Sequence, residues 1–184
     1  MVRKIMGNVP EKILQKDLEK YRQKAIKVGA TDAKIITTDM VLIDERVRAK
    51  CIYPKCDWYG TSANCPPHTM DLEQTRKVVN NYKYAIFFII RVPAETEAGK
   101  RTPEQIKYSR RTSKTRLDIL AKIESEAFYD GYYLAMGFGG GPCKPRFCPD
   151  IDCQALKPGQ GCKFPFYSRA SMEGVGMNVY AMVT

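Results

Sequence analysis

The sequence has few of the features that mark membrane, secreted or nucleotide-binding proteins. Its longest uninterrupted apolar run, residues 85–90, is far shorter than the ~20 residues that a membrane-spanning helix needs. The basic pair Arg3-Lys4 is followed by no long apolar stretch, so a secretory signal is not predicted. The glycine-rich residues 137–141 lack the Lys-Ser/Thr ending of a P-loop, and no dinucleotide-binding fingerprint is present. We therefore expect a protein of the cytoplasm.

Histidine is almost absent, whereas cysteine is abundant. His68 is the single histidine, and seven of the 184 residues are cysteine. Cytosolic thiols stay reduced, and an odd number cannot pair completely within one chain, so a disulfide scaffold is disfavoured. Metal ligation is the better interpretation. The first cysteine group consists of Cys51, Cys56 and Cys65, and the second cysteine group consists of Cys143, Cys148, Cys153 and Cys162.

Acidic residues are too few to balance the basic ones. The chain carries 30 Lys and Arg against 20 Asp and Glu, a formal charge of +10 that cluster-bound thiolates would reduce. Many of the basic side chains lie in residues 107–116, early in a predicted helix. The commonest role of such a stretch is a solvated helix face. An acidic redox protein or a larger enzyme complex is the favoured partner, and nucleic acid is the weaker alternative.

The periodicity of apolar residues predicts alternating helices and strands. Helical spacing is present at residues 10–28, 71–82, 103–129 and 169–176. Short apolar runs predict strands at residues 33–36, 40–43, 85–90, 132–136 and 178–183. Asp71 with Gln74, and Thr102 with Gln105, resemble capping boxes. The alternation favours the α/β class, with a mixed or mostly parallel sheet, flanking helices and the cysteine loops at one end.

The two halves of the chain show the same order of elements and cysteines. The first cysteine group recurs 97 residues later as Cys148, Cys153 and Cys162, with gaps of four and eight residues each time. This regularity suggests an internal duplication, with half-repeats at residues 1–93 and 94–184 in one compact domain. Coincidence among a few cysteines is the alternative.

The second cysteine group offers four thiolates within a short stretch, which suits one [4Fe–4S] cluster. Glycines surround it, and they let backbone N–H groups approach a cluster closely. Four cysteines also form a good tetrahedral zinc site, although structural zinc motifs usually have tighter Cys pairs than the gaps of four, four and eight residues here. The spacing leaves iron–sulfur and zinc binding both open.

The first cysteine group has only three thiols. It either holds a second [4Fe–4S] cluster, with an open fourth iron or another ligand, or contributes to a shared site. His68 is the candidate fourth ligand, against the commoner alternative of a loop histidine exposed to water.

Two stretches of the sequence together resemble a known family. One contains Cys56-Asp57-Trp58-Tyr59-Gly60 and Cys65-Pro66-Pro67-His68, and the other ends in Arg169-Ala170-Ser171-Met172-Glu173-Gly174-Val175-Gly176. They are similar to the cysteine-rich predicted metal-binding proteins of unknown function from anaerobic bacteria and methanogenic archaea. The resemblance runs from about residue 45 to the end and implies iron–sulfur binding in an anaerobe's cytoplasm.

The chain departs from that family at two places. The family more often has closer spacing between the first cysteines of the second group, and it often has proline where Ala170 stands. The first departure leaves open which of Cys143, Cys148 and Cys153 are ligands. We also expect a short tail beyond Thr184, as if the C-terminus were truncated.

Three functions are consistent with these residues. The first is an electron-transfer or cluster-carrying protein that serves an anaerobic enzyme system. The second is an enzyme in which an open iron of a [4Fe–4S] cluster acts as a Lewis acid or redox centre. The third is a structural zinc module that mediates protein interactions.

Overall fold

The computed structural model describes residue 5 and residues 9–97 and 99–183. The chain divides into two compact units, and each unit combines two separate stretches of sequence. The first unit comprises Met1–Ile36 and Tyr84–Gly137, and the second comprises Thr37–Lys83 and Phe138–Thr184. These units therefore do not coincide with the half-repeats at residues 1–93 and 94–184.

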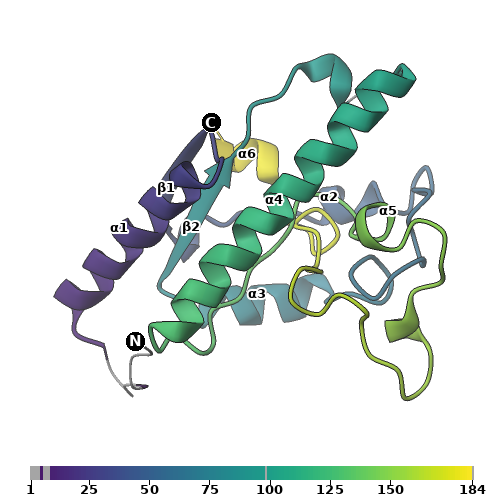
Figure 1. The fold of residues 1–184 in the computed structure, drawn as a ribbon. Coiled ribbons are helices and arrows are strands. Elements are labelled where there is room, and N and C mark those ends of the chain that lie inside the picture. The colour runs from purple at the N-terminus through teal and green to yellow at the C-terminus, as the bar shows by residue number, and fades with distance from the viewer. Residues whose placement is uncertain (1–4, 6–8, 98, 184) are drawn as a thin grey trace. The chain divides into compact units, whose positions relative to one another are not determined.

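The first unit contains two long helices and a two-stranded sheet (Figure 1). Its elements are α1 (Glu11–Lys27), β1 (Asp32–Thr37, whose last residue belongs to the second unit), β2 (Tyr84–Ile89), η2 (Ala94–Thr96) and α4 (Pro103–Tyr129). Ala25 of α1, Ala33 of β1 and Ile119 of α4 share one buried cluster. Small alanines on α1 and β1 allow the backbones to approach closely, and Ile119 fills the space that remains.

Polar side chains tie α1 to the end of α4. Lys20 Nζ lies 2.6 Å from Asp130 Oδ2 and 3.0 Å from Glu126 Oε1. The Tyr21 hydroxyl donates to Asp130 over 2.8 Å, and burial together with this carboxylate raises the pKa of Tyr21. The hydroxyl of Tyr132 donates to the buried Asp17 over 2.8 Å. The buried carboxylate of Asp17 and the half-buried carboxylate of Asp130 thus each have a hydrogen-bond donor, which offsets the cost of removing charge from water.

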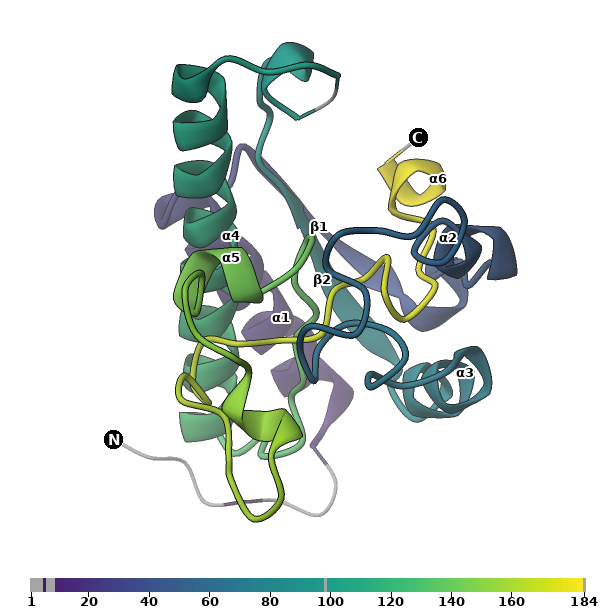
Figure 2. The same ribbon diagram turned by 90° about the vertical axis from the view of Figure 1, so that its right-hand side faces the viewer.

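Short elements and loops form the second unit, which is seen from a second side in Figure 2. Its elements are η1 (Thr38–Met40), α2 (Glu45–Ala49), α3 (Leu72–Asn80), α5 (Lys144–Phe147), η3 (Gln154–Leu156) and α6 (Val179–Val183). A buried cluster of Val79, Ala170, Val175 and Met177 forms its core. The core residues come from α3 and from the 170–177 segment, so this segment acts as a structural element although it has no helix or strand.

Local sequence signals predicted the long elements correctly. The helices at residues 10–28, 71–82 and 103–129 correspond to α1, α3 and α4, and the strands at 33–36 and 85–90 correspond to β1 and β2. Both predicted capping boxes are present, at the starts of α3 and α4. These signals depend on residues within one or two helical turns, which is why the sequence alone reveals them.

The predicted mixed or mostly parallel sheet is wrong. The sheet contains only β1 and β2 among the described residues. Thr31 N–H donates to the Ile89 carbonyl beside one end of the pair, and Thr38 N–H donates to the Lys83 carbonyl beside the other. The sequence numbers therefore run in opposite directions, and the two strands are antiparallel.

The other predicted strands are also absent from the described residues. Residues 132–136 form turns, and within residues 40–43 only Ile43 pairs, in an isolated antiparallel bridge to Met177. Residues 178–183 are helical from Val179 onward, because the Asn178 side chain caps the N–H of Ala181 over 3.2 Å. The β propensity of Val and Tyr is therefore overridden by a cap and by the lack of a partner strand.

The predicted helix at residues 169–176 is replaced by turns. Ser171 pairs with Gly139 in a parallel bridge, and its side-chain oxygen accepts a hydrogen bond from Gly174 N–H over 2.8 Å. Gly176 has a φ of 88°, which a continuing right-handed helix does not allow. The element order of the second half thus differs from that of the first, and the structure does not support the predicted duplication.

The α4 core gives a direct test of the first unit. Leu117 is 0% exposed, so Leu117→Ala should lower the free energy of unfolding by about 2–5 kcal/mol by leaving a cavity. Leu134→Ala, at a leucine that is 65% exposed in the same unit, is the matched control and should change it by less than about 0.5 kcal/mol. Urea unfolding followed by far-UV circular dichroism measures both, and equal effects would contradict this description of the core.

Candidate metal centre

All seven cysteines lie in the second unit, and all are free thiols. The first cysteine group occupies the loop between α2 and α3, and the second begins at the start of α5 and ends at Cys162. Cys65 and Cys143 are buried, and the other five are half-buried. One compact unit therefore gathers thiols that are separated by as much as 111 residues in sequence (162 − 51).

Turns fold the first cysteine loop back on itself. The α2 helix begins at the Asp44 side chain, which caps Arg46 N–H, and Cys51 N–H donates to the Arg48 carbonyl. Cys56 N–H then donates to the Cys51 carbonyl over 3.1 Å. This last bond closes a turn that brings the backbones of Cys51 and Cys56 together, although four residues separate them in sequence.

The second cysteine loop starts with a single helical turn. The Cys143 carbonyl accepts hydrogen bonds from the N–H groups of Arg146 and Phe147, and Cys148 N–H donates to the Lys144 carbonyl over 2.8 Å. Cys143 and Cys148 consequently flank α5. Farther along, Phe164 N–H donates to the sulfur of Cys162 over 3.3 Å.

The 170–177 segment links the two cysteine loops. Gly139 exchanges backbone hydrogen bonds with both neighbours of Ser171, while Ser171 N–H donates to the Asn64 carbonyl over 3.4 Å. Gly174 packs so closely that a Cβ atom there would lie 3.2 Å from Pro66 Cδ. The segment therefore contacts the residues just before Cys143 and those on both sides of Cys65.

Burial raises the pKa of Cys65 to about 11. The side chain of Ser62 acts in the opposite direction, and the thiols of Cys143, Cys51 and Cys56 raise the pKa further. The Ser62 hydroxyl is buried and has no hydrogen-bond partner at normal distance among the described residues. An O–H group in that position can donate to a thiolate sulfur, so this buried polar atom fits a metal-bound Cys65.

Two half-buried thiols also have raised pKa values. For Cys51 the causes are burial, the Cys56 thiol and the Glu173 carboxylate, and Arg48 opposes them. For Cys148 the causes are burial and the other thiols of the second cysteine group, and Lys163 opposes them. Each thiol is thus close enough to its neighbours to interact electrostatically, as members of a common ligand set do.

His68 differs from the cysteines. It is exposed, and its side chain makes no hydrogen bond or ion pair with the part of the chain that the structure describes. Across residues 9–97 and 99–183, no three Cys, His, Asp or Glu side chains converge on one position that would hold a single metal ion. The thiols are therefore gathered in one region without forming a finished single-ion site.

Three residues near the thiols were not predicted from the sequence. Asn64 Nδ2 lies 3.5 Å from the sulfur of Cys143. Ser62 acts on Cys65, and Glu173, which accepts a hydrogen bond from Gly141 N–H over 3.1 Å, acts on Cys51. For Ser62 and Asn64 a signal was available, since both are hydrogen-bond donors within three residues of Cys65. Glu173 gave none, because its relation to Cys51 depends on the fold.

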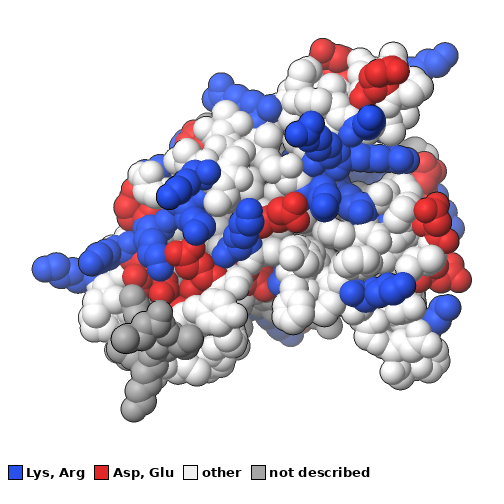
Figure 3. Space-filling model, in the orientation of Figure 1, with Lys and Arg blue, Asp and Glu red and all other residues white. Residues whose placement is uncertain are grey.

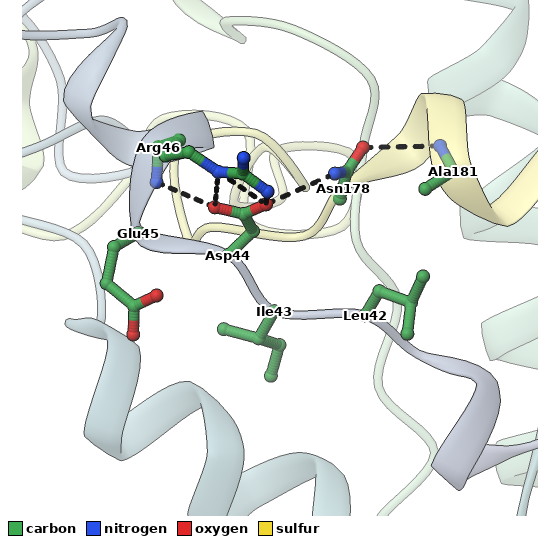
Figure 4. Close-up of a pocket in the computed structure, with 7 residues that line it drawn as sticks. All are labelled: Leu42, Ile43, Asp44, Glu45, Arg46, Asn178 and Ala181. Carbon is green, nitrogen blue, oxygen red and sulfur yellow. Dashed lines mark hydrogen bonds and ion pairs between the residues drawn. The ribbon is translucent and has the colours of Figure 1, made fainter.

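A surface pocket in the same unit contains no cysteine. It is lined by residues 42–46, Asn178 and Ala181, as Figure 4 shows. The Asp44 carboxylate accepts hydrogen bonds from Arg46 and Asn178, and the bonds from Arg46 lower the pKa of Asp44 to about 2. These bonds hold α2 in place before Cys51, which gives the pocket a structural role.

The sequence matches the model of one protein family. Residues 34–184 match the family described as "predicted metal-binding protein (DUF2284)". The match includes all seven cysteines, and the chain is a member of this family of predicted metal-binding proteins. No curated protein and no solved structure gave a significant match. None of the helices in the described part of the chain is long and apolar enough to cross a membrane.

The close approach of the 170–177 segment to the first cysteine loop can be tested with one methyl group. Gly174→Ala places a Cβ 2.9 Å from Ser171 Oγ and 3.2 Å from Pro66 Cδ, so the segment should shift and metal bound per chain should fall. Gly161→Ala is the control, because a Cβ there meets nothing within 4 Å. Metal analysis of both variants measures the effect, and equal metal contents would contradict the proposed packing.

Proposed function

We propose that this protein binds one or two [4Fe–4S] clusters through its seven cysteines and transfers electrons, or delivers a cluster, to an anaerobic enzyme system. The single observation that supports the proposal most strongly is the gathering of all seven free thiols in one unit. Soft thiolate ligands select iron–sulfur clusters, zinc or copper(I) rather than hard cations. A bound cubane supplies one-electron redox chemistry.

Hydrogen-bond donors at the sulfurs favour a cluster. The sulfur of Cys162 accepts from Phe164 N–H over 3.3 Å, and the sulfur of Cys143 lies 3.5 Å from Asn64 Nδ2. Donors to ligand sulfurs stabilise negative charge and raise the reduction potential of an iron–sulfur cluster. Structural zinc with four thiolates is compatible with the same residue types and is the competing proposal.

Aromatic side chains cover part of the second cysteine loop. The rings of Phe147 and Phe164 are stacked with centroids 5.3 Å apart, and Tyr167 packs against Phe147 at 6.2 Å. Phe147 directly precedes Cys148, and the backbone N–H of Phe164 donates a hydrogen bond to the Cys162 sulfur. Apolar rings next to ligands limit water access, which is one of the means by which proteins tune a metal centre.

The first unit offers a surface for an acidic partner. Lys107, Arg110, Arg111 and Lys114 are exposed on α4, and Figure 3 shows Lys and Arg side chains gathered along this helix. Such a patch accelerates association with an acidic redox protein, and salt weakens the effect. We propose this face as the docking surface, and a reducing cytoplasm as the location in which the cysteines do not form disulfides.

Metal content tests the function directly. Anaerobically purified protein should be brown and contain about eight irons and about eight sulfides per chain if each cysteine group holds a cubane. About four of each would indicate a single cluster. A colourless protein with stoichiometric zinc would reject the redox function and favour the structural-zinc alternative.

The docking surface is tested by charge reversal on matched helix faces. Lys107→Glu/Arg111→Glu should slow reduction of the protein by a small acidic ferredoxin at least several-fold at low salt, because electrostatic steering is lost. Lys12→Glu/Lys16→Glu on α1 is the control, since it makes the same charge change at the same spacing on another exposed face. Stopped-flow absorbance measures the rates, and equal slowing by both variants would contradict a specific site on α4.

A further inference from the structure

Cys65 and Cys143 share an environment that the other cysteines lack. Their exposures are 6% and 7%, whereas the remaining five thiols are half-buried. The two residues belong to different cysteine groups when the sequence alone is considered. In the structure they are the two least exposed thiols of the second unit.

Asn64 connects these two thiols. It directly precedes Cys65, and its Nδ2 atom lies 3.5 Å from the Cys143 sulfur and 2.7 Å from Ser168 Oγ. The Asn64 carbonyl accepts a hydrogen bond from Ser171 N–H, and Ser171 pairs with Gly139, which lies shortly before Cys143. The Asn64 side chain donates to Cys143 and the Asn64 carbonyl accepts from Ser171, so both hold the start of the second cysteine loop against the residue next to Cys65.

The position of Cys143 along the chain agrees with this arrangement. Cys143 and Cys148 lie at opposite ends of α5, so the two thiols can belong to different sites. The burial that Cys143 shares with Cys65, and its contact with Asn64, favour assigning Cys143 to the first cysteine group. The other candidate for a fourth ligand there, His68, is exposed.

We propose that Cys143 is the fourth ligand of the first cysteine group. This inference rests on the proposed iron–sulfur function and deepens it. The first site then has four thiolates and is coordinatively complete. The second site retains three thiolates, from Cys148, Cys153 and Cys162, and the iron without a thiolate lies in this site.

The position of the open iron determines where a small molecule binds. The three remaining thiols are half-buried, and they occupy a loop in which residues 149–152 and 156–161 are exposed. Lys163 directly follows Cys162 and is exposed, so it supplies positive charge beside the site. A small anion such as a thiolate or carboxylate is the ligand class that this position favours.

Two matched substitutions distinguish the ligand assignments. Limited oxidation with ferricyanide removes one ferrous iron from a cubane whose fourth iron lacks a thiolate. One electron passes to ferricyanide, and a three-iron cluster remains that electron paramagnetic resonance detects. The whole chain, loaded anaerobically, should give about one three-iron centre after this treatment, because one of its two sites is open.

Cys51→Ala and Cys162→Ala should then change the signal in opposite directions. With Cys143 in the first site, Cys51→Ala leaves three thiolates in each site, and the signal should rise to about two centres per chain. Cys162→Ala leaves only two thiolates in the second site, which should lose its cluster, so the signal should fall nearly to zero. Both cysteines are half-buried, which makes them comparable as sites of substitution.

The reverse pattern would overturn the assignment. If Cys143 belonged to the second site, Cys51→Ala would abolish the three-iron signal and Cys162→Ala would double it. His68→Ala should leave the signal unchanged, and a rise in the signal would contradict the proposal, because it would show that His68 ligates a fourth iron. Absence of iron from the wild-type protein would instead contradict the proposed function, and this is decided before any variant is compared. Cys56→Ala repeats the Cys51 test if that variant does not fold.

Discussion

The close contact between the 170–177 segment and the two cysteine loops is the constraint on which the thiol region depends. Gly174 approaches Pro66 at a distance that leaves no room for a larger side chain, and Ser171 bonds to Asn64 on one side and pairs with Gly139 on the other. The side chains of Ala170, Val175 and Met177 anchor the segment in the buried core of the second unit. Backbone groups of Ala170, Ser171 and Met172 bond to residues of both cysteine loops or to residues just before them. The spatial order of the cysteines therefore depends on this segment as well as on the loops themselves.

The two units are stabilised by different kinds of interaction. The first unit buries apolar side chains between long helices and a sheet, so its stability follows from ordinary core packing. The second unit contains helices of nine residues or fewer, and turns hold much of its backbone. Metal bound to such a region, as we propose, would stabilise it, because ligand binding to the folded state adds directly to folding free energy.

The sequence predicted what depends on neighbouring residues and failed where the partner is distant. Asp71 and Thr102 mark helix starts through bonds to residues three positions away, so α3 and α4 could be placed from the sequence. Residues 132–136 and 178–183 have apolar side chains typical of strands, yet a strand also requires a partner that no local pattern supplies. The same limit applies to the metal centre. The seven cysteines can be read from the sequence, but the position of Cys143 beside Asn64 depends on a contact across 79 residues.

Burial of Cys65 has opposite effects on its thiolate without and with a bound metal. Below pH 11 the metal-free thiol is largely protonated, because a thiolate without compensation is unfavourable in a buried position. A metal must displace that proton, so protons compete with metal, and the competition weakens as pH rises toward 11. If Cys65 binds a metal, as we propose, the positive charge of the metal and the hydroxyl of Ser62 would compensate the thiolate. Burial disfavours the metal-free thiolate, but it would strengthen the attraction of the thiolate to the metal and to the Ser62 hydroxyl, because both act in a medium of low dielectric constant.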